Sequence, residues 1–164
     1  MRIFKIAAIS VVVLFVLLLS MGLLLPSHTL VSRAVDLPAP ASVVLPWLTE
    51  VKRWPEWMQG LDSSQLRPQN DSIITIGKTE IRILRRSDTL VQTQWITEEG
   101  QRHLSTMRLF PTANGQLCTL QWQFELEVGW LPWERMGTIM HEKIFGPQME
   151  ANLEQLRQQI ITGR

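Results

Sequence analysis

The sequence predicts an α+β domain in which a long final helix lies across a curved antiparallel sheet. Three features of the chain predict it: an opening strand followed by a helical stretch, a series of short alternating segments joined by tight turns, and a long amphipathic helix at the end. Strands joined by short turns are antiparallel neighbours, and a sheet with one apolar face needs a covering layer. This order excludes a doubly wound parallel sheet.

The first 25 residues differ from the rest and are treated as a separate segment. Residues 6–25 carry no charge, and as a helix they would span about 30 Å, the thickness of the hydrocarbon core of a bilayer. A cleaved signal peptide has a shorter apolar stretch and a small-residue cleavage site. We therefore favour an uncleaved transmembrane signal-anchor over residues 1–25, followed by one domain at 26–164.

Charge asymmetry predicts the orientation of this anchor. Arg2 and Lys5 precede the apolar stretch, and the next basic residue is Arg33. Basic residues stay on the cytoplasmic side. The sequence thus predicts a single-pass membrane protein with a cytoplasmic amino end and its domain on the periplasmic or extracytoplasmic side.

The amino-terminal half of the domain combines one strand with a helical pair. A strand is expected over 29–37, ended by Pro38, which cannot donate to a ladder. Residues 41–54 show apolar residues at helical spacing, and Pro46 is expected in the first turn or at a break. A polar loop is expected over 60–70.

The remaining strands follow at short intervals, and the last has the clearest pattern. Its apolar residues alternate with Thr, Gln and Glu, which indicates one buried and one hydrated face. A helix is expected over 133–161, where apolar residues recur every three or four positions. The strands are expected at 72–76, 80–86, 89–97, 102–110 and 116–128, and the buried face of the last comprises Cys118, Leu120, Trp122, Phe124, Leu126 and Val128.

Composition narrows the classes of function. The formal net charge is +1, and the densest basic cluster is short, so nucleic acid is not an expected partner. Cys118 is the single cysteine, which we interpret as a buried core residue. No metal or other cofactor is expected, because His141-Glu142 lacks the second histidine of a zinc-protease motif at Phe145. The sequence leaves the oligomeric state open.

Four stretches together resemble the START-like (SRPBCC) superfamily, in its polyketide cyclase/dehydrase branch with a membrane anchor. They are the opening strand SRAVDLPAPASVV, the WPEW motif at 54–57, the hairpin series, and the ending GPQMEANLEQL at 146–156. The resemblance implies a helix-grip fold, with a cavity for apolar ligands between the sheet and the final helix. It does not choose among lipid carriers, cyclases, hydrolases and quinone-binding proteins.

The candidate ligand-binding residues are those expected to wall this cavity. Trp95 and Trp122 are expected to face inward from central strands, and Trp130 and Trp133 to lie at the rim. Arg108 is a candidate for binding an anionic head group, although strand parity favours the outer face. Trp54 and Trp57 are interpreted as holding the helical pair to the sheet. The full set is Trp95, Trp122, Phe124, Trp130, Trp133, Met140 and Arg108, and no catalytic residue is assigned.

Three functions remain open. The first is a membrane-tethered binding module for a hydrophobic small molecule, such as a lipid or a quinone. The second is a cyclase, dehydrase or hydrolase that works through polar cavity residues. The third is an interaction protein whose cavity is filled by its own side chains, which seven Met and seven Trp make reasonable.

Overall fold

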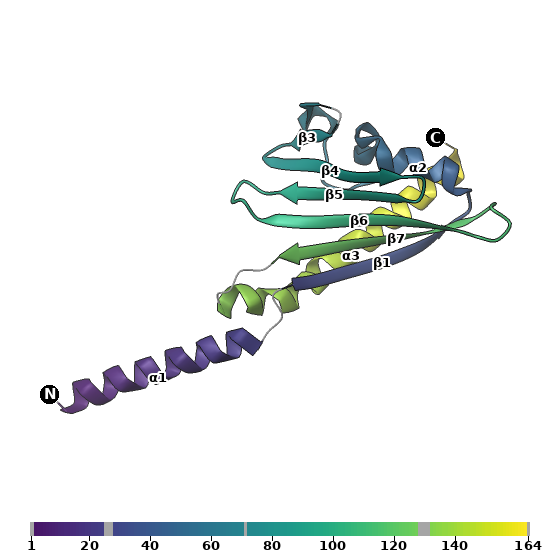
Figure 1. Cartoon of the computed structure of the whole chain (residues 1–164). Helices are drawn as coiled ribbons and strands as arrows, with labels where there is room; N and C mark the ends of the chain where they lie inside the picture. Colours follow the sequence, from purple (N-terminus) through teal and green to yellow (C-terminus); the bar gives the residue numbers. More distant parts are fainter. Residues whose placement is uncertain (1, 25–27, 71, 128–131, 164) are drawn as a thin grey trace.

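A single seven-stranded antiparallel sheet and one long helix form the domain (Figure 1). The computed structural model describes residues 2–24, 28–70, 72–127 and 132–163. The strand order is β1-β7-β6-β5-β4-β3-β2. Neighbouring strands in this sheet are therefore consecutive in sequence, except for β1 and β7. The elements are α1 (Arg2–Leu24), β1 (His28–Leu37), α2 (Ala41–Thr49), the 3-10 helices η1 (Val51–Glu56) and η2 (Ser63–Gln65), β2 (Leu66–Pro68), β3 (Ile73–Ile76), β4 (Thr79–Ser87), β5 (Leu90–Ile96), β6 (Arg102–Pro111), β7 (Cys118–Glu127) and α3 (Pro132–Thr162).

The alternation predicted for the last strand is confirmed. Each apolar residue of β7 from Cys118 to Leu126 is buried, and the residues between them are half-buried. Val128 lies outside the described residues. Paired residues of an antiparallel sheet share a face, so the register carries this apolar face onto Met107 and Leu109 of β6. The α+β class, the antiparallel sheet and the covering terminal helix are as the sequence predicts.

The helical pair differs from the prediction in where it breaks. Helix α2 runs through Pro46, and the chain leaves it at Glu50, which is extended. Pro46 is the sixth residue of α2, and the hydrogen bond that it cannot donate would go to the carbonyl of Ser42, an exposed residue. Pro46 thus lies neither in the first turn nor at a break, and the prediction is wrong in both forms.

The expected polar loop contains structure that the sequence did not reveal. Residues 63–65 form η2, and β2 adds a three-residue edge strand that pairs with β3. A strand of three residues is too short to show a period of two.

Helix α3 lies against the concave face of the sheet and contacts β1. Arg33 of β1 joins the two elements, because its Nη2 and Nε donate to Glu142 and Glu150 of α3, each at 2.6 Å. Gly146 lies between these carboxylates, and a Cβ there would meet the Arg33 guanidinium. The glycine thus lets α3 approach the strand closely.

Helix α1 projects away from the sheet (Figure 1) and contacts α3. The large apolar side chains from Ile9 to Leu18 are about half exposed. Over the residues that the structure describes, no helix meets the length and apolarity needed to cross a lipid bilayer, so the transmembrane helix expected from the sequence is not found.

Candidate aromatic pocket

A pocket opens on the concave face where the sheet, α3 and the loop after η1 meet. Its volume is about 240 Å³. Four aromatic side chains and two methionines supply most of the wall, and the polar side chains are all amides. The lining residues are Met58, Gln59, Gly60 and Leu61 of the loop, Trp95 of β5, Trp122 and Phe124 of β7, and Phe145, Gln148, Met149 and Asn152 of α3.

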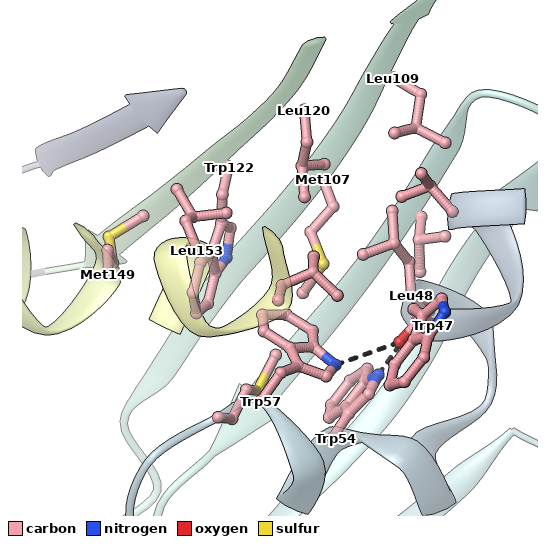
Figure 2. Close-up of a cluster of buried hydrophobic side chains, with 14 of the residues drawn as sticks. Trp47, Leu48, Trp54, Trp57, Met107, Leu109, Leu120, Trp122, Met149 and Leu153 are labelled. Carbon is pink, nitrogen blue, oxygen red and sulfur yellow. Dashed lines mark hydrogen bonds between the residues drawn. The ribbon is translucent and has the colours of Figure 1, made fainter. Parts of the chain in front are cut away.

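The WPEW motif supplies two rings that pack on the pocket's aromatic wall. Trp54 stacks on Trp95 with ring centroids 6.0 Å apart and planes 3° from parallel. Trp57 meets Trp122 edge to face at 5.8 Å, and both motif rings are fully buried. Figure 2 shows them among side chains of the strands and α3. Their interpretation as residues that hold the helical pair to the sheet agrees with this geometry.

Both indole nitrogens of the motif bond to α2. Trp54 Nε1 donates to the Leu48 carbonyl at 3.1 Å, and Trp57 Nε1 donates to the Trp47 carbonyl at 3.3 Å (Figure 2). These carbonyls lie in the last turn of α2, where helix carbonyls lack partners within the helix. The motif therefore caps α2 and fixes it to the sheet at once.

Two buried hydroxyls orient the pocket's own tryptophans. Trp122 Nε1 donates to Ser105 Oγ at 2.9 Å, and Trp95 Nε1 donates to Thr93 Oγ1 at 3.1 Å. Ser105 and Thr93 face each other in the register of β5 and β6, and both are buried. A buried indole nitrogen usually needs such a partner, so the two hydroxyls set how the rings present their faces to the pocket.

Further ring contacts carry the wall from the sheet to α3. Phe124 lies 6.0 Å from Trp95, edge to face, and 5.8 Å from Phe145, stacked. The ring of His103 also lies 5.9 Å from Phe124. The result is a continuous aromatic surface from β5 through β7 to α3.

A row of amides on α3 holds the loop that closes the pocket. Asn152 Oδ1 accepts from the Gln59 backbone N–H at 2.8 Å. Gln155 and Gln159 donate to the Glu56 carbonyl at 3.1 and 3.3 Å. These positions recur at helical spacing along one side of α3, so one helix face grips η1 and the loop after it.

The predicted cavity residues divide into three groups. Trp95, Trp122 and Phe124 line the pocket. Arg108 is exposed on the opposite face of the sheet, because its neighbours Met107 and Leu109 point inward, and Met140 is 51% exposed and does not line this pocket. Neither residue belongs to the wall of this pocket, and Arg108 takes the outer face that strand parity favours. Trp130 lies outside the described residues, and Trp133 lies in the first turn of α3 with a side chain outside the description.

Sequence reasoning missed the contribution of α3 and of the loop after η1. Phe145, Met149 and Asn152 share one face of α3 and line the pocket. Asn152 was the signal in the sequence for this contribution, since it interrupts an otherwise apolar helix face. In the structure its side chain is buried, at 4% exposure. A buried amide on such a face needs a partner, and Gln59 provides it.

The chemistry that this lining offers is apolar and neutral. The described lining holds no acid or base, and the described residues contain no group of three metal-binding side chains. Burial raises the pKa of the Cys118 thiol, and hydrogen bonds from Ser64 lower the pKa of Asp62, but neither residue lines the pocket. Cys118 is buried in the core, as predicted.

A family model described as polyketide cyclase / dehydrase and lipid transport matches residues 28–160. The match covers all seven strands and nearly all of α3. No curated protein matches the chain.

Several solved structures share the fold at low sequence identity. A START superfamily protein from Mycobacterium smegmatis superposes with a TM-score of 0.62 at 16% identity, covering 84% of this chain and 99% of that one. A norcoclaurine synthase point mutant from Thalictrum, in complex with a transition-state analogue, gives 0.63 at 13% identity, covering 83% and 96%. DynU16, from the dynemicin biosynthetic locus, gives 0.59 at 15% identity and covers 82% of this chain, which spans about half (48%) of DynU16. Likeness at this identity shows the helix-grip fold alone.

Proposed function

The chain belongs to the polyketide cyclase / dehydrase and lipid transport family, and we propose that it binds a neutral hydrophobic small molecule, lipid-like or quinone-like, in the aromatic pocket. The observation that carries the proposal is the lining itself: rings of Trp95, Trp122, Phe124 and Phe145 face a space whose polar side chains are all amides. Ligand pockets are commonly apolar with a few oriented polar groups.

Size and charge of the pocket restrict the ligand. Its volume of about 240 Å³ is below the roughly 300–1,000 Å³ of typical small-molecule sites. A compact flat ring fits this space, whereas a whole phospholipid does not. A charged ligand would lose its hydration without a partner charge in the lining, so the ligand is neutral.

Calorimetric titration of the full chain with a one-ring neutral quinone tests the proposal. We use the chain in phosphatidylcholine nanodiscs, with empty nanodiscs as the blank. Phe145→Leu keeps an apolar side chain but removes a ring from the pocket, and Phe110→Leu makes the same change at an exposed position. Loss of one aromatic contact of roughly 0.5–1.5 kcal/mol predicts three- to tenfold weaker binding for Phe145→Leu and no change for Phe110→Leu. Equal affinity in both variants would refute binding at this pocket.

A second candidate function is supported by the same small volume. Trp54 and Trp57 fill the space next to Trp95 and Trp122, as expected of an interaction protein with a self-filled cavity. In that case no neutral quinone or lipid binds, and a panel of such probes leaves the unfolding temperature unchanged. The enzymatic alternative stays a prediction, for which the described lining offers no acid or base.

We further propose that the amino-terminal segment tethers the domain to a membrane. The support is the uncharged stretch at 6–25 and the exposed apolar side chains of α1. Arg2 and Lys5 support a cytoplasmic amino end and an extracytoplasmic domain.

Flotation with phosphatidylcholine vesicles tests the tether. Replacing Leu14 and Leu17 by Asp is expected to leave the protein at the bottom of the gradient, because each charge is expensive to place in hydrocarbon. Leu117→Asp, at an exposed position of the β6–β7 turn, is expected to float like the unchanged chain. Flotation of the Leu14/Leu17 variant would contradict the tether.

A further inference from the structure

A second and larger pocket lies beside the aromatic one and shares none of its lining residues. It lies between η1 and strands β2 to β4, and its volume is about 580 Å³. Helix η1 contributes to the surroundings of both pockets, because its Val51 lines the second and its Trp54 stacks on Trp95, which lines the first. The second pocket is lined by Thr49, Glu50, Val51, Lys52, Leu66, Pro68, Gln69, Asn70, Ile74, Ile83 and Arg86.

The floor of this second pocket is apolar. Val51 and Ile74 are buried, and Ile83 and Leu66 are half-buried. Ile74 and Ile83 belong to neighbouring strands and share the concave face of the sheet. The floor therefore suits a short aliphatic or other apolar group.

A β-bulge decides which arginine of β4 faces this floor. Alternation along β4 would place Arg85 on the concave face after Ile81 and Ile83. The register shifts between Ile83 and Arg85, so Arg86 pairs with buried Val91 and takes the concave face, while Arg85 pairs with Gln92 and faces outward. Bulges commonly re-aim a side chain at a functional site.

The charge at this end of the pocket is positive. Arg86 Nη2 donates to the Thr49 carbonyl at the end of α2, at 3.1 Å. Among the described residues, neither Arg86 nor Lys52 forms an ion pair. Glu50 is the one acidic residue in the described lining, and its carboxylate is paired with Arg53 at 2.8 Å.

We propose that this second pocket binds an amphipathic anion, whose apolar tail lies on Ile74 and Ile83 and whose carboxylate or phosphate binds Arg86 and Lys52. A guanidinium donates to such oxyanions in fork geometry. The site is independent of the neutral ligand proposed for the aromatic pocket, since the two pockets share no lining residue.

Equilibrium dialysis of the full chain in phosphatidylcholine nanodiscs tests the site. The probes are octanoate, octyl phosphate, octan-1-ol and inorganic phosphate, with empty nanodiscs as the blank. Arg86→Gln is expected to weaken octanoate binding about tenfold, the factor of one charge-assisted hydrogen bond. Arg85→Gln removes the same charge one residue away on the outer face and is expected to leave the affinity unchanged.

The other probes distinguish an amphipathic anion from a purely apolar or a purely ionic ligand. Octan-1-ol and inorganic phosphate are expected to bind at least tenfold more weakly than octanoate, because each lacks one half of the ligand. Tighter binding of octyl phosphate indicates a phosphate-bearing lipid, and tighter binding of octanoate a free fatty acid. Octanol binding as tight as octanoate, equal losses in Arg85→Gln and Arg86→Gln, or loss of octanoate binding in Phe145→Leu would overturn the proposal. Lys52→Gln, which leaves the bond from Arg86 to α2 intact, repeats the test should Arg86→Gln fail to fold.

Discussion

Ser105 and Thr93 put hydroxyl groups on the apolar face of the sheet, and each accepts a hydrogen bond from a pocket indole. The two bonds differ in burial. Trp122 is 5% exposed, whereas Trp95 is half-buried and its nitrogen lies nearer to water. Removal of the hydroxyl should therefore lower the free energy of unfolding by different amounts at Ser105 and Thr93.

Ser105→Ala is expected to lower the free energy of unfolding by about 1–3 kcal/mol, the penalty of a buried donor left without a partner. Thr93→Val is expected to lower it by less than about 1 kcal/mol, because water replaces the lost acceptor of Trp95. Urea unfolding in detergent micelles measures both. Equal losses would show that burial of the indole does not decide the effect.

Gly146 lets α3 approach β1 closely, and the effect of its replacement on the free energy of unfolding should depend on Arg33. Alanine normally stabilises a helix interior relative to glycine by roughly 0.5–1 kcal/mol. Here a Cβ would meet the Arg33 guanidinium, the far end of a flexible side chain. Moving it away from two exposed carboxylates costs roughly 0–1 kcal/mol per ion pair, which offsets the gain from alanine, so Gly146→Ala is expected to leave the free energy of unfolding nearly unchanged.

The Arg33→Ala background supplies the matched control for this change. Without the guanidinium the added Cβ no longer meets a close neighbour, and Gly146→Ala is expected to stabilise there. A double-mutant cycle over thermal unfolding gives the coupling of the two positions. An effect of the same size in both backgrounds would show that Arg33 does not cause it.

At the scale of whole elements, α3 does more than cover the sheet, because its amide row holds η1 and the loop after it. Asn152→Leu removes the acceptor of the Gln59 N–H and is expected to speed amide hydrogen exchange at residues 58–61 by roughly tenfold, for about 1.4 kcal/mol lost. Gln158→Leu, on the exposed side of α3 where Gln158 bonds Glu154, is expected to leave that exchange unchanged. Faster exchange in both variants would point to general loosening of the helix.

The elements that the sequence predicted well are those with a local physical signal. Strand β7 alternates over ten residues, and Asn114-Gly115 marks the turn before it, where Gly115 takes a positive φ of 66°. The missed features depend on tertiary structure. The bulge in β4 reverses parity at Arg85 and Arg86, and β2 has three residues held only by pairing with β3.

The residues of the aromatic pocket also divide into those with a local signal in the sequence and those that depend on tertiary structure. Trp122 and Phe124 follow from strand parity alone, and both line the pocket. Phe145 could not be assigned, because helical periodicity gives the apolar face of α3 but not which strand lies beneath each turn. Asn152 stands out in the sequence as a polar residue on that face, but its partner Gln59 is known only from the structure. Met140 shows the converse, since it continues the apolar repeat of α3 yet is 51% exposed where the helix passes beyond this pocket.

At the scale of the whole molecule, the domain has two chambers of different chemistry, and the WPEW motif packs behind the wall of the aromatic one. The chamber over β5 to β7 is aromatic and neutral, and the chamber over β2 to β4 is aliphatic with a cationic end. Trp54 stacks on Trp95 of the aromatic chamber and is fully buried. Replacing this residue should therefore change both the stability of the fold and the size of ligand that the aromatic pocket prefers.

Trp54→Leu is expected to lower the free energy of unfolding by about 2–4 kcal/mol, through lost burial and a residual cavity. The same cavity enlarges the aromatic pocket, so the affinity for a two-ring naphthoquinone is expected to rise relative to a one-ring benzoquinone.

Trp47→Leu provides the control, because Trp47 is buried in α2 beneath Arg53 and lines neither pocket. Its loss lowers stability without altering the preference for ligand size. Calorimetric titration of both variants with the two quinones decides the point: an unchanged preference in Trp54→Leu, or the same shift in Trp47→Leu, would mean that Trp54 supports the fold without setting the size of the pocket.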